Sequence, residues 1–307
     1  MPALSRQQLA ILLFLTLVWG INWPVLKLGV QGFPPLSFRA VSLLLGLPVM
    51  WLMLRLLRVS FRIPRMHWGQ VLWLGLFNLV LWNALIIVAI PMLSSGRAAI
   101  LGYTMPIFSA LLGALWFRDR LSARGWAGVA AATVGVLLLL SNELASMGGR
   151  PLGVLLMLGA AAAWALGTRL LRGSQLPVAT ATLSFWMMVE ATLAMCVLAL
   201  LFERGQWHAP SPGAQGAIAF NALLVLGLGQ TAWFFLARTL PPLASTLSVM
   251  MIPVLGVFSG ALWLGEQLHW QDWASIALMT LAIGSVLWPA RAPATPAFNG
   301  RTPGSGR

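Results

Sequence analysis

The sequence has little charge, and above all little acidic charge. Charged residues make up 8% of the 307 residues, far below the roughly 25% that is typical of soluble globular domains. Asp and Glu together number 6, against 19 Lys and Arg, while hydrophobic residues make up 59% of the chain. This composition excludes an ordinary soluble domain, because too little polar surface is available to face water, and it favours a lipid environment.

Cysteine and histidine are also scarce. The single cysteine, Cys196, excludes an internal disulfide and argues against a thiol-based metal site. The three histidines, His67, His208 and His269, lie far apart beside segment ends, so we expect no metal site and no cofactor. The first apolar stretch is too long for a signal-peptide core, and no small-residue cleavage site follows it. We therefore expect it to remain as a membrane segment.

Apolar segments of about 20 residues predict an all-α membrane protein with ten transmembrane helices. They fall at residues 8–28, 36–57, 68–90, 94–117, 122–140, 152–171, 178–202, 214–237, 243–264 and 270–289. The breaks between them contain turn-forming residues, such as GFPP at 32–35 and HAPSPG at 208–213. Residues 290–307 are rich in Pro, Gly and Ala, and we expect them to form a disordered cytoplasmic tail.

One stretch near the middle of the chain recurs near its end. Residues 106–121 read PIFSALLGALWFRDRL and residues 253–268 read PVLGVFSGALWLGEQL. A proline, the tetrapeptide GALW, an acidic residue and the closing leucine match at one offset. The chain therefore reads as two copies of one unit, residues 8–140 and 152–289, and such duplication in an apolar chain is typical of transporters built from repeats.

The positions of the basic residues predict the orientation. If the N-terminus is cytoplasmic, fourteen of the 19 Lys and Arg residues fall on the inner side, and Lys27, Arg39, Arg97, Arg150 and Arg204 fall in the outer half. Both termini then lie in the cytoplasm. Five helices per unit is an odd number, so the second unit enters the membrane from the opposite side, which gives a 5+5 inverted repeat. The arginines are scattered through short loops, so we expect no nucleic-acid partner.

Several motifs resemble the EamA-type branch of the drug/metabolite transporter superfamily. They are VWGINWPVLK at 18–27, FR at 38–39, SSGRAAILGYTMPIFSALLGALWFRDRL at 94–121 and LASTLSVMMIPVLGVFSGALWLGEQL at 243–268. The first unit departs from the family pattern, because Arg118 and Asp119 stand where Gly-Glu is usual. We therefore expect the acidic residues Asp119 and Glu266 to cap helix ends. The resemblance implies a ten-helix bundle in the inner membrane that exports small metabolites, commonly amino acids or related amphiphiles, including drugs.

Polar and aromatic residues deep in the predicted helices are candidates for a substrate site, because such groups usually face a cavity or a partner helix. Trp19 and Asn22 share a face of the first helix, and Trp164 is the repeat counterpart of Trp19. Asn78 lies in the third helix, and Tyr103 is the only tyrosine. We expect these five residues to line a mostly aromatic cavity near the bilayer midplane. The alternative is that the tryptophans form interfacial belts and the asparagines only join helices.

Prolines and charges complete the set of candidates. We expect helix kinks at Pro24, Pro106 and Pro253, because proline removes a backbone donor. Glu190 lies about twelve residues from either end of its predicted helix, where an isolated charge costs at least ~2.5 kcal/mol. It should be protonated, paired with Arg39 or Arg97, or face water. Proton coupling and a buried ion pair are both open roles for it.

Three alternatives to metabolite export remain at this point. A phosphorylated-metabolite exchanger needs two or more cations near the midplane, whereas Lys27, Arg39 and Arg97 lie toward the outer end. A membrane enzyme needs a nucleophile, a metal or an acid/base group of residues, and one deep carboxylate without clustered histidines argues against it. An assembly protein leaves the inverted repeat without a purpose. The expected partners are a small-molecule substrate, lipid and, if Glu190 couples transport to them, protons; the sequence leaves the oligomeric state open.

Overall fold

The computed structural model describes residues 5–118, 122–145, 151–233 and 242–287, and these residues are helical with no strand. The first part of the chain forms α1 (Arg6–Gly32), α2 (Pro35–Leu56), α3 (Trp68–Gly75), the π segment η2 (Leu76–Val80), α4 (Leu81–Ala89), α5 (Ser95–Gly102), α6 (Met105–Leu115) and α7 (Ala123–Ala145). Short 3-10 turns, η1 (Arg65–His67) and η3 (Ile90–Met92), flank the α3–α4 helix.

The second part of the chain repeats the pattern of lengths. It forms α8 (Pro151–Gly173), α9 (Thr180–Phe202), the 3-10 turn η4 (Arg204–Gln206), α10 (Pro212–Phe220), the π segment η5 (Asn221–Gly229), α12 (Pro242–Leu264) and α13 (Trp270–Leu287). Each predicted segment is mainly helical where the structure describes it, and the segment 94–117 is divided by a turn at Tyr103 and Thr104. Asp119, the tail at 290–307 and the end of the predicted segment 214–237 lie outside the described residues.

Many of these helices are long and apolar enough to cross a membrane. Seven qualify on length and hydropathy, counting α3–η2–α4, α5–α6 and α10–η5 as continuous units, and two shorter apolar helices cover Ala123–Leu139 and Met251–Leu264. The prediction of an all-α membrane protein is therefore confirmed. The count of ten crossings stays a prediction.

Local sequence explains where several helices begin. Ser5 forms a capping box with Gln8 at the start of α1, and Ser94 and Ser211 cap α5 and α10 through their hydroxyls. Proline in the first turn sets the starts of α2 and α6, where a missing backbone donor costs nothing. Pro106 therefore follows an interruption between α5 and α6, whereas Pro24 and Pro253 lie inside continuous helices.

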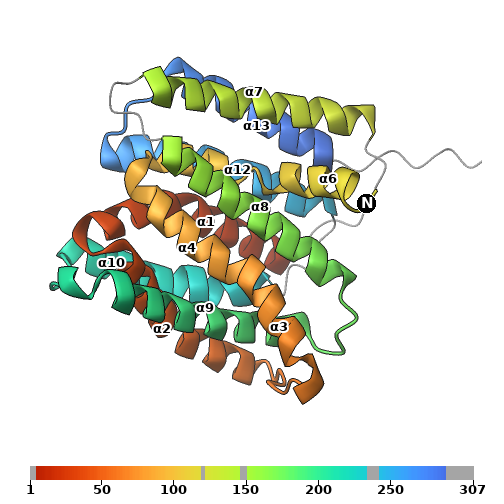
Figure 1. Ribbon diagram of the computed structural model, residues 1–307, viewed down its shortest axis with the longest axis vertical. Helices are drawn as coiled ribbons and strands as arrows, with labels where there is room; N and C mark the ends of the chain where they lie inside the picture. Colours follow the sequence, from red (N-terminus) through yellow and green to blue (C-terminus); the bar gives the residue numbers. More distant parts are fainter. Residues whose placement is uncertain (1–4, 119–121, 146–150, 234–241, 288–307) are drawn as a thin grey trace, which may run out of the picture.

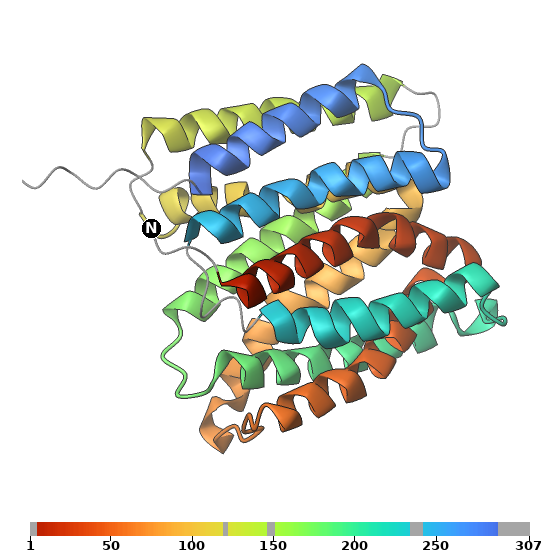
Figure 2. The same cartoon turned by 180° about the vertical axis from the view of Figure 1, so that it is seen from behind.

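The helices pack side by side as a tall stack (Figure 1). The pair α7 and α13 forms one edge of the stack, α2 and α3 form the other, and α1, α8 and α12 lie between them. The view from behind shows α1 packed between α12 and the α10–η5 helix (Figure 2). The contacts come in matched sets: α1 packs on α12 as α8 packs on α6, and α2 packs on η5 as α9 packs on η2.

The two sides of the stack at which helices start and end differ in charge. We name one side the acidic end: α2, α5, α8, α10 and α13 begin there, on the left of Figure 1, and Glu203, Glu266 and Asp272 lie there. We name the other the basic end: α1, α7 and α9 begin there, and it holds Arg55, Arg58, Arg62, Arg65 and Arg172.

Candidate functional site

The aromatic face of α1 lies inside the bundle. Trp19 is half-buried, with its ring centroid 5.7 Å from that of Trp233. Trp23, one turn further along α1, is buried. Its ring packs against that of Tyr103 in a T-shaped arrangement, with ring centroids 6.3 Å apart. Asn22 lies between these two tryptophans in sequence, and its side-chain Oδ1 is buried without a hydrogen-bond partner. An unsatisfied amide oxygen beside aromatic rings is what a polar substrate group or a bound water can use.

The predicted residues on the other side of the bundle form a second group. Trp164 of α8 is half-buried and packs on Trp82 of α4, with ring centroids 5.2 Å apart. Asn78 is buried at the α8 interface, where it accepts a long hydrogen bond of 3.5 Å from the hydroxyl of Thr168. A side chain at Gly167 would come within 2.6 Å of the Asn78 amide, so this glycine makes room for it.

The structure does not bring the five predicted residues into one cluster of touching side chains. Trp19 and Asn22 belong to α1, whereas Asn78 of η2 bonds Thr168 of α8 and Trp164 of α8 packs on Trp82 of α4. Helix α5 packs against both α1 and α8, and Tyr103 caps its end. The five residues therefore come from four neighbouring helical units, and their role as a cavity lining stays a prediction.

Buried asparagines accompany the π segments. A π turn shifts the backbone bonding from i−4 to i−5 and so leaves carbonyl groups without their usual donor. Asn78 and Asn83 donate to the carbonyls of Leu74 and Leu79, at 2.9 and 2.7 Å. Asn221, the first residue of η5, donates in the same way to the carbonyl of Ala217 at 3.1 Å. These amides therefore satisfy the backbone of their own helices.

Two carboxylates at the acidic end bind the first turns of other helices. Glu266 accepts hydrogen bonds from the Ser95 backbone N–H at 2.6 Å and the Ser95 hydroxyl at 2.8 Å, at the start of α5. Glu203 accepts from the backbone N–H groups of Leu36 and Ser37 at 2.9 and 2.7 Å, and from the Ser37 hydroxyl at 2.8 Å, at the start of α2. Both carboxylates occupy the positive end of a helix dipole, so the expected capping role of Glu266 is confirmed.

The cations near the acidic end have different partners. Arg97 donates through Nε to Asp272 at 2.8 Å, and both side chains are largely buried. Lys27 donates to the carbonyls of Ile90, Pro91 and Leu93 at 3.0, 3.1 and 2.6 Å. Arg39 is buried and donates to the Asn221 Oδ1 atom at 3.3 Å.

Glu190 forms an ion pair with neither Arg39 nor Arg97. Arg97 binds Asp272 instead, and Arg39 binds Asn221. Glu190 lies halfway along α9, beside Gly75 of α3, and its Oε2 atom is buried without a hydrogen-bond partner. The missing side chain of Gly75 is what makes room for the carboxyl group. The pairing with Arg39 or Arg97 that the sequence left open for Glu190 is not seen in the structure, where Asp272 and Asn221 accept from the two guanidinium groups.

Family models and known proteins give this arrangement a context. The model of the EamA-like transporter family matches residues 8–141 and again residues 151–288. The chain belongs to the EamA-like transporter family. It is therefore a membrane transporter by family, and its apolar helices agree with that membership.

Individual relatives match this chain over most of its length and most of their own. The "Uncharacterized transporter YoaV" of Bacillus subtilis is 25% identical over 87% of this chain and 91% of its own. The "Uncharacterized inner membrane transporter YedA" of Escherichia coli is 26% identical over 92% of each chain. The "Probable amino-acid metabolite efflux pump" of Escherichia coli is 26% identical over 86% of this chain and 89% of its own. A crystal structure described only as that of a protein shares the fold, with a TM-score of 0.64 at 19% identity, over 92% of this chain and 98% of its own.

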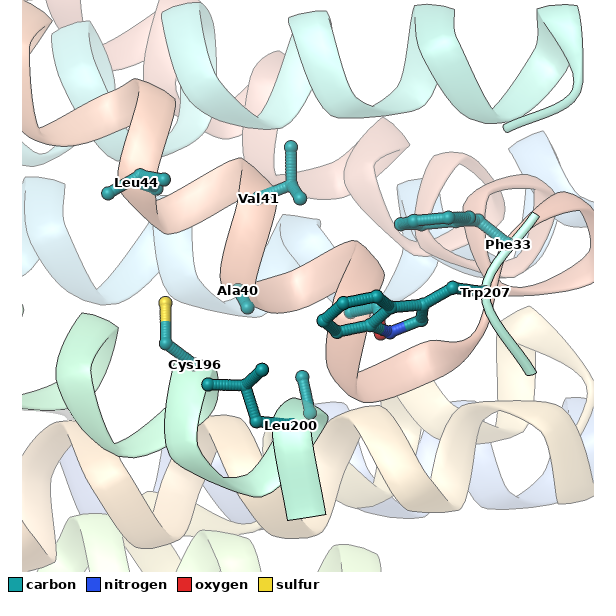
Figure 3. A pocket seen from close by; sticks show the side chains of 9 residues that line it. Phe33, Ala40, Val41, Leu44, Cys196, Leu200 and Trp207 are labelled. Atoms are coloured by element: carbon teal, nitrogen blue, oxygen red, sulfur yellow. The ribbon is translucent and has the colours of Figure 1, made fainter. Parts of the chain in front are cut away.

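The structure has a groove between α2 and α9 (Figure 3). It has a cavity volume of about 360 Å³, and its lining is apolar apart from Ser37. Cys196 and Leu200 come from α9, Val41 and Leu44 from α2, and Trp207 closes one end together with Phe33. Leu44 and Leu200 are about half exposed, as expected of side chains that face lipid. The groove suits a hydrocarbon chain better than a polar metabolite.

The sequence did not point to Glu203, Asp272 or Asn221 as functional or structural partners. Glu203 and Asp272 lie at segment ends and Asn221 lies inside an apolar run, and the partner of each lies more than 160 residues away. One signal was available in the sequence. The chain has only 6 acidic residues, and three of them, Glu203, Glu266 and Asp272, fall at the same end of the predicted helices, which indicates a shared role there. Within the described residues, no group of three metal-ligating side chains comes together.

Proposed function

We propose that this protein is a secondary-active transporter of the inner membrane that exports small metabolites, amino acids or related amphiphilic compounds, by alternating access. The observation that carries the proposal is the family match over both halves of the chain. The names of two relatives, a probable amino-acid metabolite efflux pump and an uncharacterized inner membrane transporter, support the substrate class and the membrane. Transport needs no covalent chemistry, so we infer that the protein is not an enzyme.

We propose ten crossings arranged as a 5+5 inverted repeat, with the units at 8–140 and 152–289. The matched contacts support it, because helices α1 and α8 each pack on the fourth helical unit of the other half. The π segments η2 and η5 support it as well, since they fall in the third helical unit of each half. Such a repeat lets one half rock against the other around a central site.

We propose that the basic end faces the cytoplasm, with both termini on that side and the tail at 290–307 in the cytoplasm. The support is the excess of arginine at this end. Reporter fusions or cysteine labelling after residues 62, 145 and 207 should read inside, outside and outside. An outside reading at 62, or an inside reading at 145, contradicts this topology.

We propose that Trp19, Asn22, Asn78, Tyr103 and Trp164 shape the substrate path. Trp19, Asn22 and Trp164 are half-buried and can reach a substrate, whereas the buried Asn78 and Tyr103 hold the helices behind them. The aromatic character suits an amphiphilic solute, whose apolar part stacks on the rings. Trp19→Ala and Tyr103→Ala should reduce flux while the protein still inserts. Normal transport by both variants would contradict this site.

The decisive test of the function is flux from proteoliposomes that contain the purified protein. The panel consists of amino acids, phosphorylated sugars and cationic drugs, each measured with and without a proton gradient. We expect movement of amino acids or related amphiphiles, at a rate above that of protein-free liposomes. Exchange of phosphorylated sugars alone would establish the phosphorylated-metabolite alternative. No movement of any compound would count against transport and favour an assembly role.

A further inference from the structure

Arg39 differs from the other two cations that lie within the helices near the acidic end. Lys27 is surrounded by three backbone carbonyls, and Arg97 has a carboxylate partner, Asp272. Arg39 is only 4% exposed, yet its one hydrogen bond joins Nη1 to the neutral Asn221 Oδ1 atom at 3.3 Å. Its Nε atom is buried without a partner. Among the described residues, Arg39 makes no ion pair.

Glu203, which binds the first turn of α2, does not form an ion pair with Arg39. Glu203 reaches the first turn of α2, close to Arg39 in sequence, but both of its oxygens are bound by Leu36 and Ser37. A buried charge without a counter-charge costs several kcal/mol. A protein that keeps such a cation in place of an apolar residue has a use for its charge.

The position of Arg39 is also where the two halves of the molecule meet. Arg39 lies in α2, within the first family match, and Asn221 begins η5, within the second. Asn221 is completely buried, and its amide nitrogen is held by the carbonyl of Ala217, which leaves its Oδ1 atom for Arg39. π segments are frequent at functional sites. A group that binds Arg39 would therefore act across the interface that alternating access changes.

We propose that Arg39 recognises a carboxylate group of the transported metabolite, and that Asn221 holds the guanidinium when no substrate is bound. The proposal rests on the proposed transport function and narrows its substrate to compounds that carry a carboxylate. A guanidinium binds a carboxylate best through two parallel N–H donors, and the unpartnered Nε atom provides one of them. A single cation matches a singly charged carboxylate better than a doubly charged phosphate.

The first test measures thermal unfolding of the purified protein in nanodiscs without substrate. Arg39→Met removes an unpaired buried charge and keeps an unbranched side chain, so we expect Tm to stay unchanged or to rise. The matched control is Arg97→Met, which leaves Asp272 buried without its cation and should lower Tm by several degrees. If Arg39→Met lowers Tm as much as Arg97→Met does, Arg39 is structural and the proposal is wrong.

The second test measures ligand-induced changes in Tm, with the twenty common amino acids as probes. We expect at least one free amino acid to raise Tm of the wild-type protein by about 2 °C or more. Its primary amide, which has the same side chain and no carboxylate, should not. The shift should be absent in Arg39→Met and retained in a Trp207→Phe control, which alters the surface groove and removes the bond from the Trp207 N–H to the Ser37 hydroxyl but leaves Arg39 and Asn221 unchanged. The absence of any shift, or an equal shift with the amide, would overturn the proposal.

A third variant supplies the carboxylate from the protein itself. Asn221→Asp places an acidic oxygen where Arg39 already has its one partner, so Tm without substrate should rise. The same internal ion pair should compete with substrate, and both the ligand-induced shift and the flux should fall. A variant that binds and transports amino acids as the wild type does would contradict the assigned role of Arg39.

Flux measured beside these shifts separates the two proposals. Wild-type protein that moves cationic drugs, unaffected by Arg39→Met, would keep the transport function and remove the carboxylate site. Free amino acids that raise Tm through Arg39 without any flux would keep the site and remove the transport function.

Discussion

The hydrogen bonds that join the two halves of the chain differ between the acidic end and the basic end. At the acidic end, the second-half carboxylates of Glu203, Glu266 and Asp272 each bind a helix of the first half. At the basic end, the described bonds between the halves go to backbone carbonyls: Thr182 donates to Ser60, Trp186 to Phe61 and Arg124 to Ser285. Half of the chain's 6 acidic residues are therefore used to close one end.

The difference shows where a chain with few charged residues places its carboxylates. Hydrogen bonds that involve a charged group are roughly twice as strong as neutral ones, and two of these carboxylates also meet the positive ends of helices. We therefore expect the acidic end to be held more firmly than the basic end. In the proposed alternating-access cycle, opening of the acidic end would break these contacts, which would then contribute to the free energy needed for opening.

The largest effect should come from the buried pair of Asp272 and Arg97. Asp272→Ala leaves the Arg97 guanidinium without its carboxylate and also removes the cap that Asp272 provides to the His269 N–H. Removal of one partner of a buried pair costs about 3–5 kcal/mol. We expect a clear loss of thermal stability in nanodiscs. The double variant Asp272→Ala/Arg97→Met should recover part of it, and a double variant as unstable as the single one would contradict the pairing.

The next largest effect should come from the two glutamates that cap helices. Glu203→Gln and Glu266→Gln keep the shape of the side chain but remove its charge, and we expect a loss of about 1–3 kcal/mol for each. Glu203 is buried whereas Glu266 is partly exposed, so the loss should be greater for Glu203. Chemical or thermal unfolding of the two variants side by side checks the order. A greater loss at Glu266 would mean that burial does not decide the strength of these caps.

The sequence allowed the helices to be predicted better than their contacts. Apolar runs and prolines located the segments to within a few residues, because helix length follows membrane thickness. The GALW duplication pointed to two related halves, which the family match also covers. The partners of Arg39 and Arg97 could not be predicted, because Asn221 and Asp272 lie 182 and 175 residues further along the chain. Tertiary packing brings them together, and no local pattern encodes that distance.

At the basic end, the expected effect of a single change is smaller. Trp186→Phe removes the N–H that donates to the Phe61 carbonyl at 2.8 Å but keeps an aromatic ring beside Trp68. A neutral hydrogen bond contributes about 0.5–1.5 kcal/mol. We expect a modest decrease in unfolding temperature, below that of Glu203→Gln. If Trp186→Phe is the more damaging of the two, the basic end is the firmer one and the comparison is reversed.

The smallest effect on stability should come from Glu190, which lies between the two ends. Neither arginine binds it, and one of its oxygens is buried without a partner, so Glu190→Gln breaks no ion pair. We expect the unfolding free energy to change by less than about 0.5 kcal/mol, as for substitutions that remove no specific interaction.

If Glu190 carries protons during transport, the same variant should abolish accumulation against a gradient and spare exchange down one, since Gln cannot bind and release a proton. Uphill and exchange flux in the same proteoliposomes separate these cases. A large loss of stability would mean that the carboxylate has a structural partner after all, and normal activity in both assays would leave Glu190 a tolerated polar residue in the space that Gly75 provides.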